Sequence, residues 1–398
     1  MTSAGSRRPK IPPAIWALGF VSLLMDISSE MIHSLLPVFL VTALGASALT
    51  VGLIEGAAEA TALIVKVFSG ALSDYWGKRK PLALFGYGLG ALSKPLFAIA
   101  ASSAMVLAAR LIDRIGKGIR GAPRDALVAD LAPAEIRGAA YGLRQSLDTV
   151  GAFLGPLLAM GLMLLSNDDF RAVFWVAIVP GFMAVALLAF GVREPETRRA
   201  SVRVNPISRV NLARLGKHYW WVVVLGAVFT LARFSEAFLV LRAQQGGLPL
   251  AMAPLVLIAM NVVYALGAFP LGRLSDSMSH TRLLAVGLAV LIGADLALAY
   301  GAGWPWVWVG ISLWGLHLAI TQGLLATMVA DASPPDLRGT AFGFFNLVSG
   351  VAMLAASVLA GALWDVLGAR STFQAGAGFC ALALAAIALR PRSTGKRG

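Results

Sequence analysis

Two short motifs occur twice in this chain, about half its length apart. Residues 130–142 read DLAPAEIRGAAYG, and residues 331–343 read DASPPDLRGTAFG. Upstream of each copy, GALSD at 70–74 recurs as GRLSD at 272–276, with nearly the same offset. Two landmarks that share one offset indicate duplication followed by fusion, and such self-similarity constrains a fold more strongly than any single motif. The chain is therefore expected to fold as two similar halves.

The composition places these halves in a membrane. Of the 398 residues, 58% are hydrophobic and only 13% are charged, with a mean hydropathy of +0.78. A soluble domain would carry roughly 25% charged residues. Apolar runs recur along nearly the whole chain, and a run of about 20 residues is long enough to cross a hydrocarbon core. These features exclude a soluble protein, and two parallel repeats in a membrane indicate a transporter whose halves rock against each other.

The apolar runs predict an all-α polytopic membrane protein with twelve transmembrane helices in two pseudo-symmetric six-helix bundles. In the first half we expect membrane segments at 13–44, 48–73, 81–101, 103–130, 136–165 and 171–192. In the second half we expect them at 218–242, 250–275, 281–301, 304–331, 337–367 and 371–390. The predicted domains are an N-terminal bundle (1–192), a cytoplasmic linker (193–217) and a C-terminal bundle (218–398).

The distribution of charge predicts the orientation in the membrane. The net charge is +13, and the basic residues gather at the termini, at 78–80 and in the linker at 193–217. Cytoplasmic loops carry such an excess of Lys and Arg, so both chain ends and the linker are predicted to be cytoplasmic. Because the orientation in the membrane accounts for these basic residues, they do not indicate a nucleic-acid site. The single cysteine, Cys380, forms no intramolecular disulfide, and the sequence predicts no metal site, cofactor or phosphate-binding loop.

Predicted segment one carries charged residues where the membrane is thickest. Asp26, Glu30 and His33 share one helix face at i, i+4 and i+7. At about 1.5 Å per residue, Asp26 lies ~20 Å along the helix and thus near the middle of the bilayer. Two uncompensated carboxylates there would cost about 5–7 kcal/mol. Protonation, pairing with cations or a wet cavity would each remove this cost.

We interpret these acids as proton-coupling residues, together with Glu55 and Glu59 on one stripe of segment two. The alternative is a permanent ion pair, for example between Asp26 or Glu30 and a cation of segment four.

Segment four carries the largest concentration of intramembrane charge. Its charged residues form one helical stripe at i, i+3, i+4 and i+7, which are Arg110, Asp113, Arg114 and Lys117. Each would cost about 2.5–3.5 kcal/mol in lipid, so the stripe must face a cavity or partner groups. These cations are expected either to hold an anionic substrate or to neutralise the acids of segment one.

Three motifs resemble those of the major facilitator superfamily, and the resemblance covers essentially the whole chain. GALSDYWGKRK at 70–80 is similar to the loop motif of that family, although Tyr75 replaces its usual basic residue. Arg110 lies where the arginine motif of segment four is expected, with Asp113 and Arg114 in place of its usual Gln and Gly. GAFLGP at 151–156 is similar to the Gly-Pro motif of the antiporters, through Gly151, Gly155 and Pro156. The chain thus resembles a bacterial, exporter-like branch.

The resemblance implies roles for further residues. Segments one, four, seven and ten would line a central cavity, which adds Arg233, Glu236, His317 and Gln322 to the substrate-site candidates. The two copies of the loop motif would form a cytoplasmic gate that latches one conformation shut. Its residues would be Asp74, Gly77, Lys78, Arg79, Asp130 and Arg137, mirrored by Asp276, Asp331 and Arg338.

The prediction is a monomeric, multi-pass transporter of the bacterial inner membrane, not an enzyme. It would export a small organic solute in exchange for protons, by alternating access. One alternative is uptake or exchange of an organic anion, or efflux of a metal chelate. An alternative of another class is a non-transporting membrane receptor or scaffold. Because most midplane charge and the Gly-Pro motif occur only in the first half, we expect that half to handle ions and the second to shape the substrate pocket.

Overall fold

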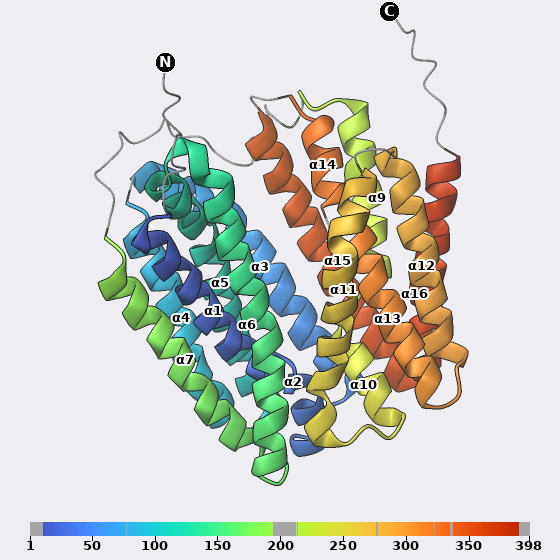
Figure 1. Cartoon of the computed structure of the whole chain (residues 1–398). Coiled ribbons are helices and arrows are strands. Elements are labelled where there is room, and N and C mark those ends of the chain that lie inside the picture. Colours follow the sequence, from blue (N-terminus) through green and yellow to red (C-terminus); the bar gives the residue numbers. More distant parts are fainter. Residues whose placement is uncertain are drawn as a thin grey trace, which may run out of the picture. The chain divides into compact units, whose positions relative to one another are not determined.

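The computed structural model describes residues 11–76, 78–193, 212, 214–275, 278–321, 323–334 and 337–389. All regular secondary structure in these ranges is helical, as Figure 1 shows. The described chain forms two compact units. Of the described residues, those at 11–39 and 61–193 belong to the first unit, and those at 40–60 and from 212 onward belong to the second. The predicted all-α polytopic fold is confirmed, whereas the predicted linker at 193–217 lies almost entirely outside the described residues.

The first unit is built from five long helices and short flanking turns (Figure 1). Its helices are α1 (Pro13–His33), α2 (Leu36–Val38), α4 (Lys80–Ala98), α5 (Ser103–Leu131), η2 (Ala134–Ile136), α6 (Arg137–Leu165) and α7 (Phe170–Gly191). A π-helical turn, η1 (Phe39–Ala43), and the long helix α3 (Ala48–Trp76) each contribute residues to both units. Pro13 begins α1, where a residue without an N–H group is tolerated. Ser102 and Asp169 cap α5 and α7 by accepting backbone N–H bonds.

Close helix contacts hold the first unit together. Helix α1 packs on α6 and α7, and α4 packs on α5 and α7. Small residues permit the α4–α5 contact, because a Cβ atom on Gly86 would lie 2.7 Å from the carbonyl oxygen of Gly116. Such close backbone approach is the usual way in which helices associate in lipid, where the hydrophobic effect between helices is absent.

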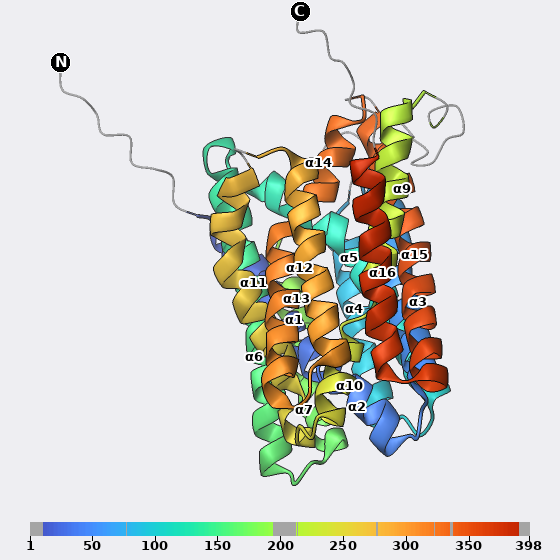
Figure 2. The ribbon, with the colours of Figure 1, turned by 90° about the vertical axis from the view of Figure 1, so that its right-hand side faces the viewer.

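Among the described residues, nine helices of the second unit follow α3. They are α9 (Lys217–Ala232), α10 (Ala237–Gln245), η3 (Leu250–Met252), α11 (Pro254–Ser275), α12 (His280–Tyr300), α13 (Trp304–Thr321), α14 (Leu324–Asp331), α15 (Arg338–Leu367) and α16 (Ala369–Ala388). In Figure 2, α12 lies beside both α13 and α16, and it packs against each of them. Helix α9 packs on α15 and α16.

The first turns of α3 belong to this second unit. Near the end of α15, the Asp365 carboxylate accepts hydrogen bonds from the backbone N–H groups of Ala48 and Leu49, both at 2.9 Å. Gly361 allows this approach, since a Cβ atom there would lie 2.4 Å from the Ala48 carbonyl oxygen. A residue 317 positions away in sequence therefore caps the start of α3.

Ten helical stretches among the described residues are long and apolar enough to cross a membrane. Of the twelve predicted segments, those at 81–101 and 103–130 fall outside this set. They correspond to α4 and α5, which pack against each other and carry buried charges that lower their hydropathy.

Three predicted segments are interrupted rather than continuous. Segment one changes at Ser34–Leu35 from α1 into a short helix and a π-helical turn. Segment seven is divided between α9 and α10 by residues 233–236. Segment ten is divided between α13 and α14, where Gly323 adopts φ +81°, a left-handed conformation that side chains disfavour. Interrupted membrane helices occur where backbone lines a binding site or a water-filled cavity, and these are three of the four segments expected to line one.

Candidate functional site

A buried ion pair lies in the interior of the first unit. Lys94 of α4 and Asp113 of α5 are 1% and 2% exposed, and the Lys94 Nζ atom lies 2.7 Å from Asp113 Oδ1. The same ammonium group donates to Ser29 Oγ of α1 at 3.0 Å. The pair thus joins three helices, and the extra hydrogen bond helps to offset the desolvation of both charges.

More cations surround this pair than it can neutralise. Arg114, Arg110 and Arg120 are all buried, and the Asp113 carboxylate interacts electrostatically with each of them as well as with Lys94. The Arg120 guanidinium also lies over the ring of Tyr87, 4.9 Å from its centre. Arg120 follows Lys117 by three residues, so the charged stripe of segment four extends further than the predicted set.

The predicted coupling acids of α1 have different partners. Glu30 Oε2 lies 3.2 Å from His33 Nδ1, and its charge interacts with Lys117 and Arg114. Asp26 instead lies near a second carboxyl group, that of Asp148 on α6, and the charges of the two groups act on each other. Two neighbouring carboxylates repel each other, which favours the neutral form of one of them. The charges of Lys117 and Arg120 also act on Asp26.

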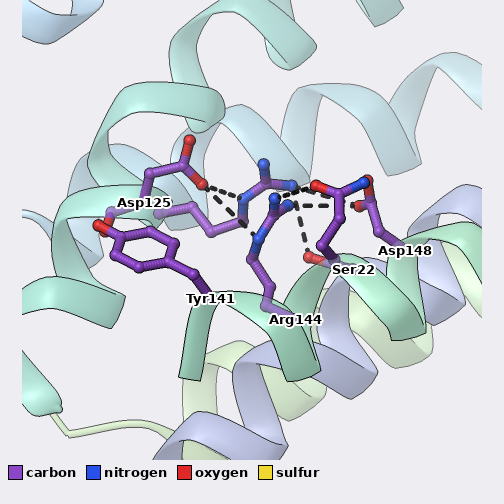
Figure 3. A network of polar contacts seen from close by, with 7 residues as sticks. Ser22, Asp125, Tyr141, Arg144 and Asp148 are labelled. Carbon is purple, nitrogen blue, oxygen red and sulfur yellow. Dashed lines mark hydrogen bonds and ion pairs between the residues drawn. The ribbon is translucent and has the colours of Figure 1, made fainter. Parts of the chain in front are cut away.

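A second network joins α1, α5 and α6, as Figure 3 shows. Arg144 Nη1 lies 3.5 Å from Asp148 Oδ1, four residues further along the same helix. Arg124 contacts Asp125 at 3.2 Å, Asp148 at 3.7 Å and the Ser22 hydroxyl at 3.4 Å.

The hydroxyl of Tyr141 donates to the backbone carbonyl of Asp125 at 2.8 Å. Asp148 belongs to this network through Arg124 and Arg144, and its charge also acts on Asp26.

The Gly-Pro motif of α6 faces the same acids. A Cβ atom on Gly151 would lie 2.6 Å from the Leu23 carbonyl oxygen and 3.1 Å from Asp26 Cβ. One on Gly155 would lie 2.7 Å from Glu30 Cβ. Pro156 lies inside the continuous helix α6. The two glycines thus bring α6 against the part of α1 that carries both coupling candidates.

Cations outnumber carboxyl groups in this interior. The buried cations are Lys94, Arg110, Arg114, Arg120 and Arg144, while Arg124 is half-buried and Lys117 is exposed. Of the acids, Asp113 is buried, whereas Asp26, Glu30, Asp125 and Asp148 are half-buried. The interior of the first unit is therefore suited to a negatively charged group.

In the second unit, the predicted residues gather around the interruption between α9 and α10. The guanidinium of Arg233 interacts electrostatically with Glu236 and with Glu59 of α3, as well as with Tyr264 of α11. Glu55, one turn before Glu59, is 1% exposed.

His317 of α13 is also buried. Its Nδ1 atom lies 2.8 Å from the Gly287 carbonyl oxygen, and its ring stacks on Phe229. The last candidate, Gln322, lies outside the described residues.

The predicted gate is only partly described. Arg79 Nε lies 2.9 Å from Asp130 Oδ2, which joins the loop motif to the end of α5. Lys78, Arg137 and Arg338 are exposed, and Asp331 lies 3.7 Å from His280 Nδ1. The side chain of Asp74, together with Gly77 and Asp276, lies outside the described residues. The gate therefore stays a prediction, supported by one ion pair in the first unit.

Sequence reasoning omitted several residues of the site. Lys94, Arg120, Arg124, Asp125 and Asp148 belong to the charged interior but were not among the predicted site residues. Continuing the stripe of segment four by i+3 and i+7 from Lys117 would have found Arg120 and Arg124. Within the described residues, no group of His, Cys, Asp or Glu is arranged to hold a metal ion.

A helical bundle with interrupted segments and a charged interior is typical of a membrane transporter, and comparison with known proteins agrees. The sequence profile of the Major Facilitator Superfamily matches residues 18–357 and 243–398. An uncharacterized MFS-type transporter of Methanocaldococcus jannaschii is 33% identical over 358 residues, covering 88% of each chain. The chain therefore belongs to the Major Facilitator Superfamily, and it is a secondary transporter rather than an enzyme.

Two further relatives cover most of the chain. The multidrug resistance protein MdtH of Aeromonas hydrophila is 26% identical over 88% of this chain and 87% of its own. The crystal structure of the human organic anion transporter MFSD10 superposes with a TM-score of 0.69 at 19% identity, covering 96% of this chain and 100% of that chain. The second likeness concerns the fold alone.

Proposed function

We propose that this protein exports a small organic solute from the bacterial cytoplasm in exchange for protons, by alternating access. The observation that carries the proposal is the close approach of two carboxyl groups on different helices, Asp26 on α1 and Asp148 on α6, beside the cations Arg124 and Arg144. Two carboxyl groups in contact cannot both ionise without strong repulsion, so the pair holds one proton that it can release. A proton held inside a membrane bundle is what a coupled transporter has to move.

The cations around the pair give a physical means of coupling. Lys117 and Arg120 act on Asp26, while Arg124 and Arg144 approach Asp148. If these cations engage an anionic group of the substrate, they stabilise the two carboxylates less, and the pair keeps its proton. When the substrate leaves, the cations favour ionisation of the pair. Substrate and proton then compete for one set of positive charges, which is the basis of antiport.

Two observations support export as the direction. MdtH, to which the chain is similar over most of its length, is described as a multidrug resistance protein. The Gly151 and Gly155 motif resembles that of antiporters and packs beside Asp26 and Glu30. The proposed protein is a monomer of the inner membrane, with both chain ends in the cytoplasm, as the excess of cations at those ends predicts.

The proposal is tested with purified protein in liposomes under an imposed pH gradient. A panel of lipophilic cations and organic anions is first screened for compounds that raise the melting temperature, because a ligand of the folded state stabilises it. Flux of each hit is then followed in both directions. Asp26→Asn should abolish flux driven by the pH gradient and preserve binding of the same hit. Asp168→Asn, in an exposed turn, is the control. Undiminished proton-driven flux in Asp26→Asn would refute the proposal.

A second candidate function is uptake or exchange of an organic anion. The excess of cations inside the first unit favours it, because buried positive charges are stabilised by an anionic ligand. In the same liposomes, exchange of an anion such as citrate without any pH gradient, and without response to lipophilic cations, would support this function over multidrug export.

A further inference from the structure

The second unit contains a buried carboxyl group that no part of the proposed mechanism uses. Asp295 lies within the membrane-spanning helix α12 and is 0% exposed. Neither of its carboxyl oxygens has a hydrogen-bond partner among the described residues. An ionised carboxylate without a partner is too costly in such surroundings, so the group is expected to be neutral and to carry a proton.

The walls around Asp295 are apolar and aromatic. The carboxyl faces α16 at Gly376, where a Cβ atom would lie 2.6 Å from Asp295 Oδ2 and 3.0 Å from the ring of Phe234. Phe234 belongs to the interruption between α9 and α10, and its ring lies 5.4 Å from that of Trp314 and 5.7 Å from that of Phe373. An aromatic side chain from the break in segment seven and the carboxyl group thus approach the same point on α16.

Among the described residues, the charged and titratable side chains on the helices near Asp295 either contact other groups or carry no positive charge. On α16, Cys380 is buried near Asp295, and Arg370 lies over the ring of Tyr300. On α13, His317 contacts the Gly287 carbonyl oxygen. On α10, Arg242 donates to the carbonyl oxygen of Leu298 at 2.9 Å.

On α14, Asp331 is near His280, at the start of α12. In the break itself, Arg233 interacts with Glu236 and Glu59.

We propose that Asp295 is a proton-binding site of the second unit, covered by Phe234 and opened to water by movement of the α9–α10 break. On release, the O–H bond of the carboxylic acid breaks, its electron pair stays on the carboxylate, and water takes the proton. The break also carries Arg233, so proton release at Asp295 and the position of Arg233 would be linked. This inference does not depend on coupling at Asp26, because it concerns a different unit and a different carboxyl group.

The first test is infrared spectroscopy on the purified full-length protein. The carbonyl stretch of a protonated carboxylic acid should be present in the wild type and reduced in Asp295→Asn. It should shift when the protein is moved into D₂O, because the site exchanges its proton. In Phe234→Ala this shift should be several-fold faster, whereas Phe344→Ala, at another aromatic contact of the same unit, should leave its rate unchanged.

Equal spectra for the wild type and Asp295→Asn at every pH would overturn the proposal. A band that never shifts in D₂O would overturn it too, because it would mark a permanently neutral structural group.

A second test needs no variant. A hydrophobic carbodiimide adds to a protonated carboxyl group in an apolar site, and the adduct rearranges to a stable acylurea that mass spectrometry locates. We expect the adduct on Asp295, with a yield that falls as the pH rises. Absence of the adduct at every pH would contradict the proposal. Loss of proton-driven flux in Asp26→Asn would not change this result, so the two hypotheses can fail separately.

Discussion

The interiors of the two units treat buried charge in opposite ways. In the first, Asp113 is buried together with several arginines, and its partner Lys94 lies on another helix. In the second, Asp295 is equally buried, yet it faces Gly376 and the ring of Phe234 and has no partner among the described residues. A charge in a membrane is stabilised either by an opposite charge or by losing its own through protonation; Asp113 shows the first solution and Asp295 the second.

This comparison refines the roles that the sequence predicts for the two halves in ion binding and substrate binding. The first half was predicted to handle ions because it holds most of the intramembrane charge. Fixed ion pairs, however, also hold helices in place. A single carboxyl group without a partner makes no such contact, and the role left to it is to bind a proton. The number of charges in a unit is therefore a poor measure of how many protons it exchanges.

The largest expected effect is on the shared proton of the first unit. Asp148→Asn should abolish proton-driven flux as completely as Asp26→Asn does, because either change removes the carboxyl pair. The double variant should lose nothing further, since residues that act as one unit are not additive. Flux in liposomes measures this. Asp125→Asn is the matched control, because Asp125 contacts the same arginines and not Asp26. Normal flux in Asp148→Asn would remove the pair from the mechanism.

The next effect is on stability. Lys94→Met leaves Asp113 with less compensation and should destabilise the protein by about 3–5 kcal/mol, as removal of one partner from a buried pair does. Lys94→Met combined with Asp113→Leu should recover most of this loss, because no uncompensated carboxylate remains. Thermal unfolding in detergent measures both. Equal destabilisation by the single and double changes would mean that the pair is not what holds α4 to α5.

A smaller effect is expected at the start of α3. Asp365→Ala removes the acceptor for the N–H groups of Ala48 and Leu49 and should cost about 0.5–2 kcal/mol, the usual range for a helix cap. Asp365→Asn keeps one acceptor oxygen and should cost less. Hydrogen exchange of the two amides is the direct measurement. Unchanged exchange in Asp365→Ala would show that the cap contributes nothing.

The smallest effect is expected at Asp295, where Asp295→Asn should change the melting temperature only slightly. A neutral amide of similar shape replaces a carboxyl group that is already neutral and has no partner to lose. Asp113→Asn is the matched comparison, and it should be much more destabilising because it removes a charge that four cations face. If Asp295→Asn destabilised the protein as strongly as Asp113→Asn, Asp295 would be an ionised structural group and the contrast between the units would be wrong.

Much of the helical framework could be predicted from the sequence. The expected segment 136–165 corresponds to α6 at Arg137–Leu165, and 103–130 corresponds to α5 at Ser103–Leu131. The breaks in segments one, seven and ten do not show in the hydropathy, because each whole stretch, break included, is long and apolar enough to cross a membrane. Hydropathy records whether a residue tolerates lipid, and it does not record whether the backbone stays helical.

The contacts of the charged site were likewise predictable only within a single helix. The pair Arg144–Asp148 follows from i,i+4 spacing, and the stripe of α5 follows from helical periodicity. The pairs Lys94–Asp113 and Asp26–Asp148 join different helices, so spacing along the chain carries no information about them. Asp295 was missed because a single acid in an apolar run makes no pattern.

The sequence by itself determined the membrane class, the duplication and the family, since these depend on composition and on motifs that recur at a fixed offset. The tertiary structure decided which charges meet, which helices are interrupted and which carboxyl group has no partner. The physical reason is that the cost of a charge in a membrane depends on what lies within a few ångströms of it, and those neighbours come from distant parts of the chain.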